Sequence, residues 1–179
     1  RDAMRDWAQA TYGPVMEALR QREGDLSQGE TLLLADLNGA LLEIGTMQDE
    51  RQALADRAAS FVGVEGEPDP SAVSPEEFST AMKYGTKLGG EPFYQAALDY
   101  ARTTSDQRER RVILSTLATY AGEAELETLY EEVQGEDWQG QEAWSVMQSS
   151  LNNEDNRDKA WALYKQSFDQ VLPRTPEIR

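Results

Sequence analysis

Apolar residues recur at helical spacing along almost the whole chain, and no segment alternates between apolar and polar residues as a strand does. This pattern predicts an all-α protein of about nine helices, each roughly 12 to 18 residues long and joined by short polar turns. The first three are expected over residues 4–22, 30–44 and 48–62, and the others between residues 75 and 172. Antiparallel helices of this kind stack into superhelices of the HEAT or armadillo type. Because no fixed-period repeat is visible, we expect a degenerate superhelix, with a compact bundle as the alternative.

The buried faces of these helices follow from the same spacing. The first helix is expected to bury an apolar face, and the second, which is rich in leucine, is expected to be the most buried of all. Two tryptophans near the C-terminal end also lie on apolar faces and are expected in the core. These residues are Tyr12, Val15, Met16 and Leu19, then Leu33, Leu34, Leu37 and Leu41, and finally Trp144 and Trp161.

Three sequence signals predict where helices begin. Ser27 with Glu30 fits a capping box, in which each side chain accepts a backbone N–H that the new helix leaves unpaired. Ser74, followed by proline and two glutamates, is expected to be an N-cap at the end of a loop over residues 63–74. Thr104 with Gln107 is expected to cap the sixth helix in the same way.

The composition excludes several classes of function. The 179 residues, which fit one domain of ordinary size, include 33 acidic and 17 basic side chains, for a net charge of −16. Such a chain repels phosphate, so we expect no nucleic acid and no membrane partner, and no apolar run is long enough to span a bilayer. The absence of Cys and His removes thiol nucleophiles, Ser-His arrangements and the common zinc ligands. Carboxylate chemistry with Mg²⁺ or Ca²⁺ stays open, for example at Glu127 and Glu131, although a solvated acidic surface is the favoured interpretation there.

One basic cluster and one tryptophan are the candidate contacts for a peptide or another domain. Arg108, Arg110 and Arg111 could receive a carboxylate, including a peptide C-terminus, through bidentate hydrogen bonds. The alternative is that they pair with neighbours such as Glu109 or with an adjacent helix. Trp138, in the polar loop at residues 135–140, could anchor an interface.

Three stretches of the chain contain sequence patterns that suggest a known protein family. Residues 91–108 contain an aromatic helix, a short turn and a charged helix start; residues 111–118 end in Leu-Ser-Thr-Leu-Ala; residues 153–174 contain Ala160-Trp161 and a later Phe-Asp pair. With these, the chain from about Gly24 to Pro173 resembles the helical C-terminal domain of aminopeptidase N-type zinc metallopeptidases, which the puromycin-sensitive and endoplasmic-reticulum aminopeptidases share.

The resemblance implies an accessory role. The family's domain forms a concave bowl that closes over the catalytic domain, encloses the active site and contacts the far end of the peptide. The catalytic H-E-x-x-H motif and the G-x-M-E-N loop are missing from this chain, so zinc is expected in a separate catalytic domain of the same polypeptide and no cofactor is expected here. The expected partners are that catalytic domain and the peptide substrate.

The chain starts at Arg1 without an initiator Met, so we expect one helical-repeat domain over residues 1–179, cut from a longer protein. Either a cytoplasmic or an exported bacterial location fits the absence of Cys. The alternative function is a stand-alone helical-repeat scaffold that binds a protein partner, and an independent carboxylate-metal enzyme is a third interpretation.

Overall fold

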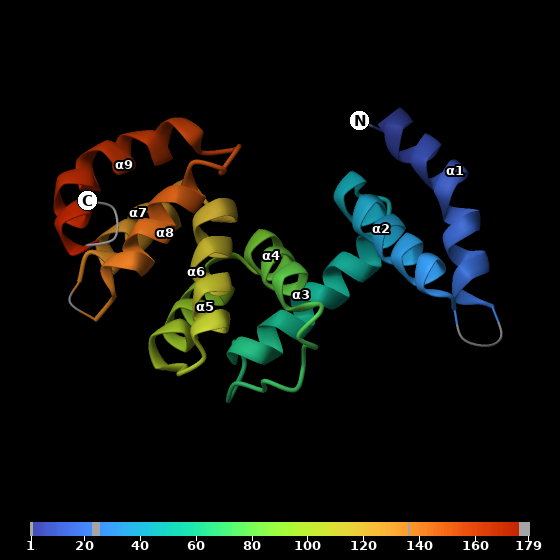
Figure 1. Cartoon of the computed structure of the whole chain (residues 1–179), viewed down its shortest axis with the longest axis horizontal. Helices are drawn as coiled ribbons and strands as arrows, with labels where there is room; N and C mark the ends of the chain where they lie inside the picture. The colour runs from blue at the N-terminus through green and yellow to red at the C-terminus, as the bar shows by residue number, and fades with distance from the viewer. Residues whose placement is uncertain (1, 23–25, 136, 176–179) are drawn as a thin grey trace. The chain divides into compact units, whose positions relative to one another are not determined.

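The computed structural model describes residues 2–22, 26–135 and 137–175, and within them it contains nine α-helices, one short 3-10 helix and no strand (Figure 1). The all-helical prediction is therefore confirmed. The helices are α1 (Asp2–Arg20), α2 (Gln28–Ile44), α3 (Gln48–Val62), α4 (Phe78–Leu88), α5 (Gly90–Thr103), α6 (Gln107–Tyr120), α7 (Glu123–Val133), α8 (Gly140–Ser150), α9 (Arg157–Val171) and the 3-10 helix η1 (Leu172–Arg174).

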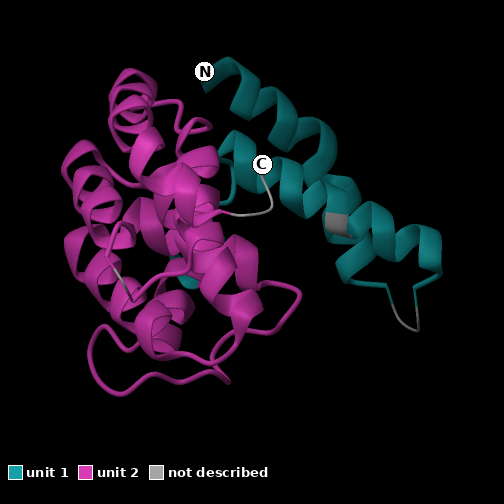
Figure 2. Ribbon diagram, turned by 60° about the vertical axis from the view of Figure 1, so that its left-hand side comes forward, with its two compact units in different colours: residues 1–53 teal, residues 54–179 magenta. Residues whose placement is uncertain are grey.

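The chain forms two compact units, residues 1–53 and residues 54–179 (Figure 2). Helix α3 runs from the first unit into the second, because the boundary falls inside it. Unit 1 contains the helix pair α1 and α2, which pack against each other. Unit 2 contains α4 to α9 and η1, and it holds all of the candidate contact residues.

Both ends of α2 carry the polar contacts that a helix needs. Ser27 Oγ accepts a hydrogen bond from Glu30 N, and the Glu30 carboxylate accepts one from Ser27 N at 2.9 Å, which confirms the predicted capping box. At the other end, Gly45 takes the left-handed conformation with φ 89°, which glycine adopts without steric cost. Arg51 Nε donates to the carbonyl of Leu42 at 2.6 Å, so a cation also lies at the negative end of the helix.

The predicted buried faces of the first two helices are wrong in part. Tyr12, Val15 and Leu33 are exposed, whereas Met16 and Leu41 are buried. Helix α2 is therefore not the most buried helix of the chain. The physical reason is that within unit 1 each of these helices packs against one partner, and a single contact covers only a narrow stripe of a helix.

Helix α6 lies at the centre of unit 2, where it contacts α4, α5, α7 and α8. Helix α8 in turn contacts α7 and α9. Burying each leucine or isoleucine side chain of this core contributes about 1.5–3 kcal/mol. The fully buried side chains include Ile113, Leu114, Leu117, Leu126, Leu129 and Met147. Because α6 and α8 each pack against other helices as well as against one another, the residues where they face each other are held in fixed positions.

The predicted start of α4 is displaced. Ser74 Oγ accepts a hydrogen bond from Glu77 N at 3.4 Å, which is the contact expected of an N-cap. The residues after Ser74 form a turn, however, and the α-helix begins at Phe78. The Ser-Pro-Glu-Glu signal thus produces a capped turn that leads into the helix.

The predicted cap of α6 is also wrong. Asp106 is the N-cap, and its carboxylate accepts hydrogen bonds from Arg108 N at 2.8 Å and Glu109 N at 3.1 Å. Thr104 Oγ1 instead accepts from Asp106 N at 3.2 Å. An aspartate placed directly before the helix offers two acceptor oxygens to the first free N–H groups, so it takes the position that the more distant threonine was expected to fill.

Trp161 does not lie in the core, contrary to the prediction. It is 50% exposed and stacks on Tyr164, with the two ring centroids 5.6 Å apart. Trp144 is half-buried and lies 6.2 Å from Tyr164 and 6.1 Å from Phe168. Aromatic residues on α9 therefore pack along one another at the surface of unit 2, with Trp161 at the exposed end.

Candidate functional site

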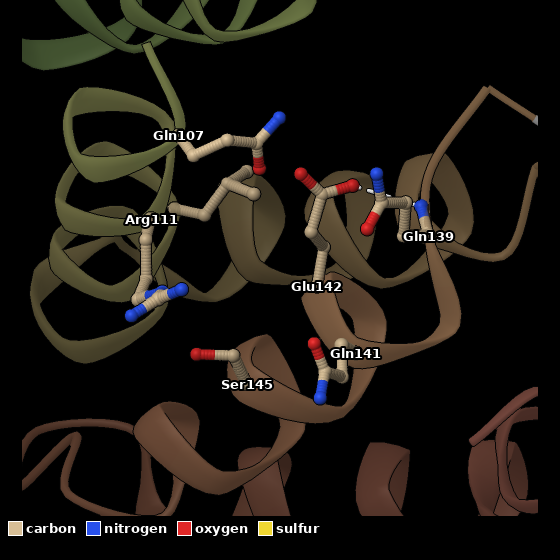
Figure 3. A pocket seen from close by; sticks show the side chains of 7 residues that line it. Gln107, Arg111, Gln139, Gln141, Glu142 and Ser145 are labelled. Atoms are coloured by element: carbon tan, nitrogen blue, oxygen red, sulfur yellow. Dashed lines mark hydrogen bonds between the residues drawn. The ribbon is translucent and has the colours of Figure 1, made fainter. Parts of the chain in front are cut away.

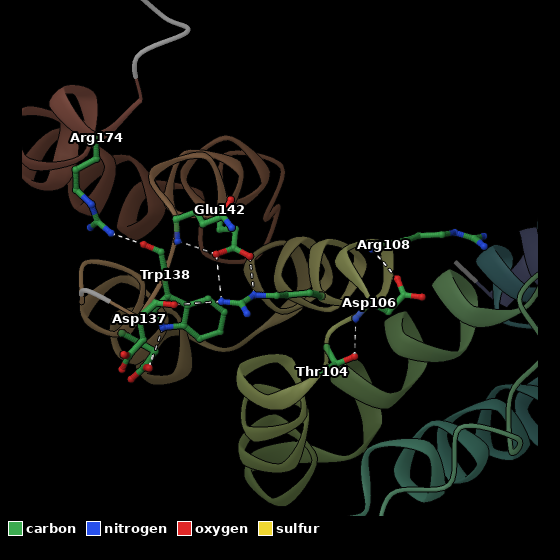
Figure 4. Close-up of polar contacts among 10 residues, drawn as sticks. Thr104, Asp106, Arg108, Asp137, Trp138, Glu142 and Arg174 are labelled. Atoms are coloured by element: carbon green, nitrogen blue, oxygen red, sulfur yellow. Dashed lines mark hydrogen bonds and ion pairs between the residues drawn. The ribbon is translucent and has the colours of Figure 1, made fainter.

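Trp138 is held by contacts on several sides. Only 2% of its surface is exposed. Its indole Nε1 donates a hydrogen bond to Glu132 Oε1 at 3.0 Å, and the guanidinium carbon of Arg110 lies 4.6 Å from the ring centroid (Figure 4). A guanidinium over an indole face is a favourable cation–π contact. Burial leaves almost no surface of Trp138 for a partner, so in this fold its contacts are with the chain itself.

Arg110 pairs with Glu142 across the contact between α6 and α8. The Nε atom lies 2.6 Å from Oε1, and Nη2 donates to Oε2 at 3.2 Å. The Nε–H direction is not aligned for a hydrogen bond, so the closer contact is an ion pair. The two side chains are 14% and 11% exposed, so water screens this pair weakly. For Arg110, the alternative of pairing with an adjacent helix holds.

The same group of contacts continues to α5 and α7 through Glu132. Arg102 Nε donates to Glu132 Oε1 at 2.9 Å. This hydrogen bond lowers the pKa of Glu132, and the hydrogen bond from Trp138 and the positive charge of Arg102 act in the same direction, against partial desolvation. Glu132 is therefore held ionised between two donors, one on α5 and one in the loop between α7 and α8.

Arg174, in η1, fixes this loop through its backbone. Its guanidinium donates to the carbonyls of Gln134 at 2.9 Å, Gly135 at 3.0 Å and Trp138 at 2.5 Å. Its own backbone packs against the start of α8, where a Cβ added to Gly140 would lie 2.0 Å from the Arg174 carbonyl oxygen. The position of Trp138 thus depends on glycine at residue 140 and on arginine at residue 174.

The structure does not bring the three predicted arginines together. Figure 4 shows Arg108 extending away from Trp138 and Glu142. Arg108 Nη2 donates to the carbonyl of Pro75 at 3.3 Å. Of the three, Arg110 is part of a partly buried ion pair, Arg108 is exposed on the side of α4, and Arg111 lies on a third side of α6.

Arg111 lines a pocket of about 260 Å³ between α6 and α8 (Figure 3). Helix α6 contributes Gln107, Arg111 and Leu114. Helix α8 and the residue before it contribute the other lining residues, which are Gln139, Gln141, Glu142 and Ser145. Within residues 2–22, 26–135 and 137–175, no carboxylate pairs with the guanidinium of Arg111.

The pocket can therefore offer one cation and several amide and hydroxyl groups to a ligand. Glu142 also lines the pocket, but its carboxylate is paired with the guanidinium of Arg110. The glutamines and Ser145 were missed in the sequence because none is a typical catalytic residue. The available signal was spacing: Gln107 and Arg111, and likewise Gln141 and Ser145, are four residues apart and so share a helix face.

Among the described residues, no cluster of three or more acidic side chains could hold a metal ion. Glu127, one of the two glutamates considered for carboxylate chemistry, pairs with Lys159. The part of the chain that the structure describes also contains no helix long and apolar enough to cross a membrane.

Searches of curated proteins and of solved structures found no match to the chain. A family model described as the ERAP1-like C-terminal domain matches residues 1–178. The match agrees with the resemblance drawn from residues 91–108, 111–118 and 153–174, and it extends over both compact units. The chain therefore belongs to the ERAP1-like C-terminal domain family, the C-terminal domain of ERAP1-like aminopeptidases.

Proposed function

We propose that this chain encloses the active site of a zinc aminopeptidase and helps to bind its peptide substrate. The observation that carries the proposal is the family match over residues 1–178. The chain has no His and no Cys, so the zinc and its ligands belong to the catalytic domain of the same polypeptide. The role of this chain is then to limit access and to position the peptide.

The pocket between α6 and α8 is the proposed contact for the far end of the peptide. Arg111 supplies the cation that a peptide C-terminal carboxylate requires, and charge-assisted hydrogen bonds of this kind contribute about 1.5–3 kcal/mol. Gln107 and Ser145 supply donors and acceptors for the backbone beside that carboxylate. A volume of about 260 Å³ suits one terminal residue, since pockets for larger ligands are about 300–1,000 Å³. Arg108, which is exposed, remains a predicted contact of a more peripheral kind, whereas Trp138 is buried and is not proposed as one.

The helical arrangement fits a domain that opens and closes. We propose that the nine helices belong to one degenerate HEAT-like superhelical domain that spans both units, because one family model covers them. In such an arrangement, small rotations between successive helix pairs add up to a large change at the rim. A bowl of this kind would admit peptides when open and exclude water and folded proteins when closed.

The role of Arg111 is tested in the full-length parent protein with the substitution Arg111→Ala. Two peptides of equal sequence are compared, one with a free C-terminal carboxylate and one with a C-terminal amide. The variant is expected to raise KM for the carboxylate peptide by about tenfold and to leave the amide peptide unchanged. An aminoacyl-p-nitroanilide, too short to reach the pocket, should be cleaved at the wild-type rate, and a zinc chelator should abolish all three activities.

The matched control is Arg157→Ala, which removes an exposed arginine on α9. It should leave both peptides unaffected. An equal loss on the carboxylate and amide peptides, or a loss on the nitroanilide, would mean that Arg111 acts on the fold and receives no carboxylate. If the full-length protein cleaves none of the three substrates, the whole proposal fails.

A further inference from the structure

Three polar side chains of the pocket between α6 and α8 carry hydrogen-bonding groups that the chain itself does not use. Within the part of the chain that the structure describes, no hydrogen bond or ion pair involves the side chains of Gln107, Arg111 and Ser145. Figure 3 shows all three around the same space, with Gln107 and Arg111 on α6 and Ser145 on α8. A ligand that enters this pocket therefore meets donors and acceptors that have no partner in the protein.

The rest of the pocket wall offers little to an apolar ligand. Leu114 is the one apolar residue among the described residues that line the pocket, and only 1% of its surface is exposed. Glu142 already accepts hydrogen bonds from Arg110 Nη2 at 3.2 Å and from Gln139 N at 2.8 Å. An apolar side chain in the pocket would therefore bury little apolar surface and would displace water from polar groups.

The hydrogen-bonding capacity of the pocket exceeds what the backbone of a peptide terminus requires. The terminal carboxylate takes N–H groups of Arg111, which can only donate. The last residue has one other backbone group, its N–H, which takes one acceptor oxygen. Gln107 carries an oxygen and an NH₂ group, and the hydroxyl of Ser145 both donates and accepts. Donors are therefore left over, and the side chain of the last residue can satisfy them only if it is polar.

We propose that this pocket selects peptides whose last residue carries an amide or hydroxyl side chain, and that Gln107 and Ser145 make the selection. Glutamine is the clearest case, because its amide can accept from the NH₂ group of Gln107 and donate to the hydroxyl oxygen of Ser145. Methionine has a similar length and shape, but its thioether is only a weak acceptor and donates nothing. The selection rests on the proposed function, since it requires the peptide carboxylate to bind Arg111.

Competition between two peptides in one reaction tests the proposal. The full-length parent protein receives equal amounts of two peptides that differ only in the last residue, glutamine or methionine, each with a free carboxylate. Mass spectrometry follows the loss of both peptides, and the ratio of the two rates gives the ratio of their kcat/KM values. A neutral hydrogen bond contributes a factor of about two to ten. We expect a preference of about fivefold for the glutamine peptide, because water also reaches the pocket.

Two variants show whether the preference arises in this pocket. Gln107→Met replaces the amide by an apolar side chain of similar size, and Ser145→Ala removes the hydroxyl. Each should lower the preference for the glutamine peptide to about twofold or less. Gln148→Met is the matched control, because Gln148 is exposed on α8 and lies outside the pocket, and it should leave the preference unchanged. Since Gln107 is exposed and Ser145 is half-buried, all three variants should keep the helical circular dichroism of the wild type.

Two outcomes would overturn this selection while the carboxylate contact at Arg111 stands. The parent could cleave the two peptides equally well or prefer methionine, although Arg111→Ala still raises KM for the carboxylate peptide alone. The preference could also persist unchanged in both Gln107→Met and Ser145→Ala, which would place its origin in the catalytic domain. If Arg111→Ala does not distinguish the carboxylate peptide from the amide peptide, the carboxylate contact and the selection are both wrong. The two sets of measurements therefore tell the two failures apart.

Discussion

Among the glycines that the structure describes, Gly140 leaves the least room for a side chain. A Cβ at this position would lie 2.0 Å from the Arg174 carbonyl oxygen and 2.5 Å from its carbonyl carbon. Both are backbone atoms, so a rotamer change cannot relieve the overlap. We predict that Gly140→Ala lowers the free energy of unfolding by about 2–3 kcal/mol, measured by urea unfolding followed by circular dichroism. Gly66→Ala is the control in the same unit, because a Cβ there meets nothing within 4 Å; equal effects of the two changes would contradict the prediction.

Arg110 offers a second test at the scale of one residue. The substitution Arg110→Met keeps the length of the side chain but leaves the Glu142 carboxylate without its cation at 11% exposure. Breaking a fully buried pair from one side costs about 3–5 kcal/mol, because the remaining charge is left unpaired; for this partly buried pair we take about 1–3 kcal/mol. We therefore expect a drop of that size in the free energy of unfolding, and a drop below 1 kcal/mol for Arg157→Met at the exposed control position.

A double substitution tests whether the unpaired charge of Glu142 causes the loss of stability in Arg110→Met. Glu142 also accepts a hydrogen bond from Gln139 N at 2.8 Å, and glutamine can keep this cap. Adding Glu142→Gln to Arg110→Met should recover part of the lost stability, since no unpaired charge remains. A double variant less stable than Arg110→Met alone would show that the unpaired charge of Glu142 does not cause the loss of stability in the single variant.

At the scale of helices, the sequence predicted element types well and their ends less well. The Ser27 capping box forms as expected because both of its members belong to one turn and need no distant residue. The start of α6 was misplaced because Thr104 and Asp106 are both residue types that cap helices, and the spacing alone does not decide between them; in the structure Asp106 accepts from Arg108 N, and Thr104 accepts from Asp106 N. Trp161 was placed in the core because helical periodicity identifies an apolar face but does not say whether another helix covers it.

Glu132 joins α5 to the loop after α7 and makes the contact between these elements sensitive to acid. The hydrogen bond from Arg102 is the main reason that the pKa of Glu132 lies below the ordinary value for a glutamate. A lowered folded-state pKa contributes stability that is fully present above about pH 4.5 and is lost as the pH falls through the folded-state pKa. We predict that the free energy of unfolding of Glu132→Gln depends less steeply on pH below 5 than that of the wild type.

Glu131→Gln is the matched control for this pH dependence. Glu131 is the preceding residue on α7 and is exposed. Both substitutions remove one carboxylate and leave the rest of the acidic chain unchanged, so only the hydrogen bonds to Arg102 and Trp138 differ. If the two variants and the wild type lose stability in parallel from pH 6 to pH 3 in urea titrations, Glu132 has no special role in acid unfolding.

For the whole molecule, the sequence predicted the fold class and the family, and it predicted the site only in part. Both predictions rest on local sequence patterns, namely the helical periodicity and the three matching stretches. Such patterns can be recognised without knowing which distant residues are in contact. The prediction that Arg108, Arg110 and Arg111 act together is wrong, because residues close in sequence on a helix point to different sides. Arg108 donates to the carbonyl of Pro75, Arg110 lies over the ring of Trp138, and Arg111 lines the pocket. The burial of Trp138 depends on Arg174, which is far away in the sequence.

The net charge of −16 affects the stability of the whole chain. At pH 7 the carboxylates repel one another in the compact state more strongly than in the unfolded chain. Salt screens this repulsion over a Debye length of about 10 Å at 0.1 M. We therefore predict that the melting temperature rises between 10 mM and 300 mM NaCl by about 2–4 °C, which corresponds to about 1 kcal/mol for a chain of this size.

The control for the salt prediction is a change of pH. Near the sequence pI of about 4.3 the net charge is close to zero, so salt should leave the melting temperature unchanged or lower it by screening the favourable pairs, among them Arg102 with Glu132. An equal concentration of sucrose, which carries no charge, separates screening from a general effect of solutes. A melting temperature at pH 7 that does not respond to NaCl would mean that local ion pairs such as Arg110 with Glu142 already offset the excess of negative charge.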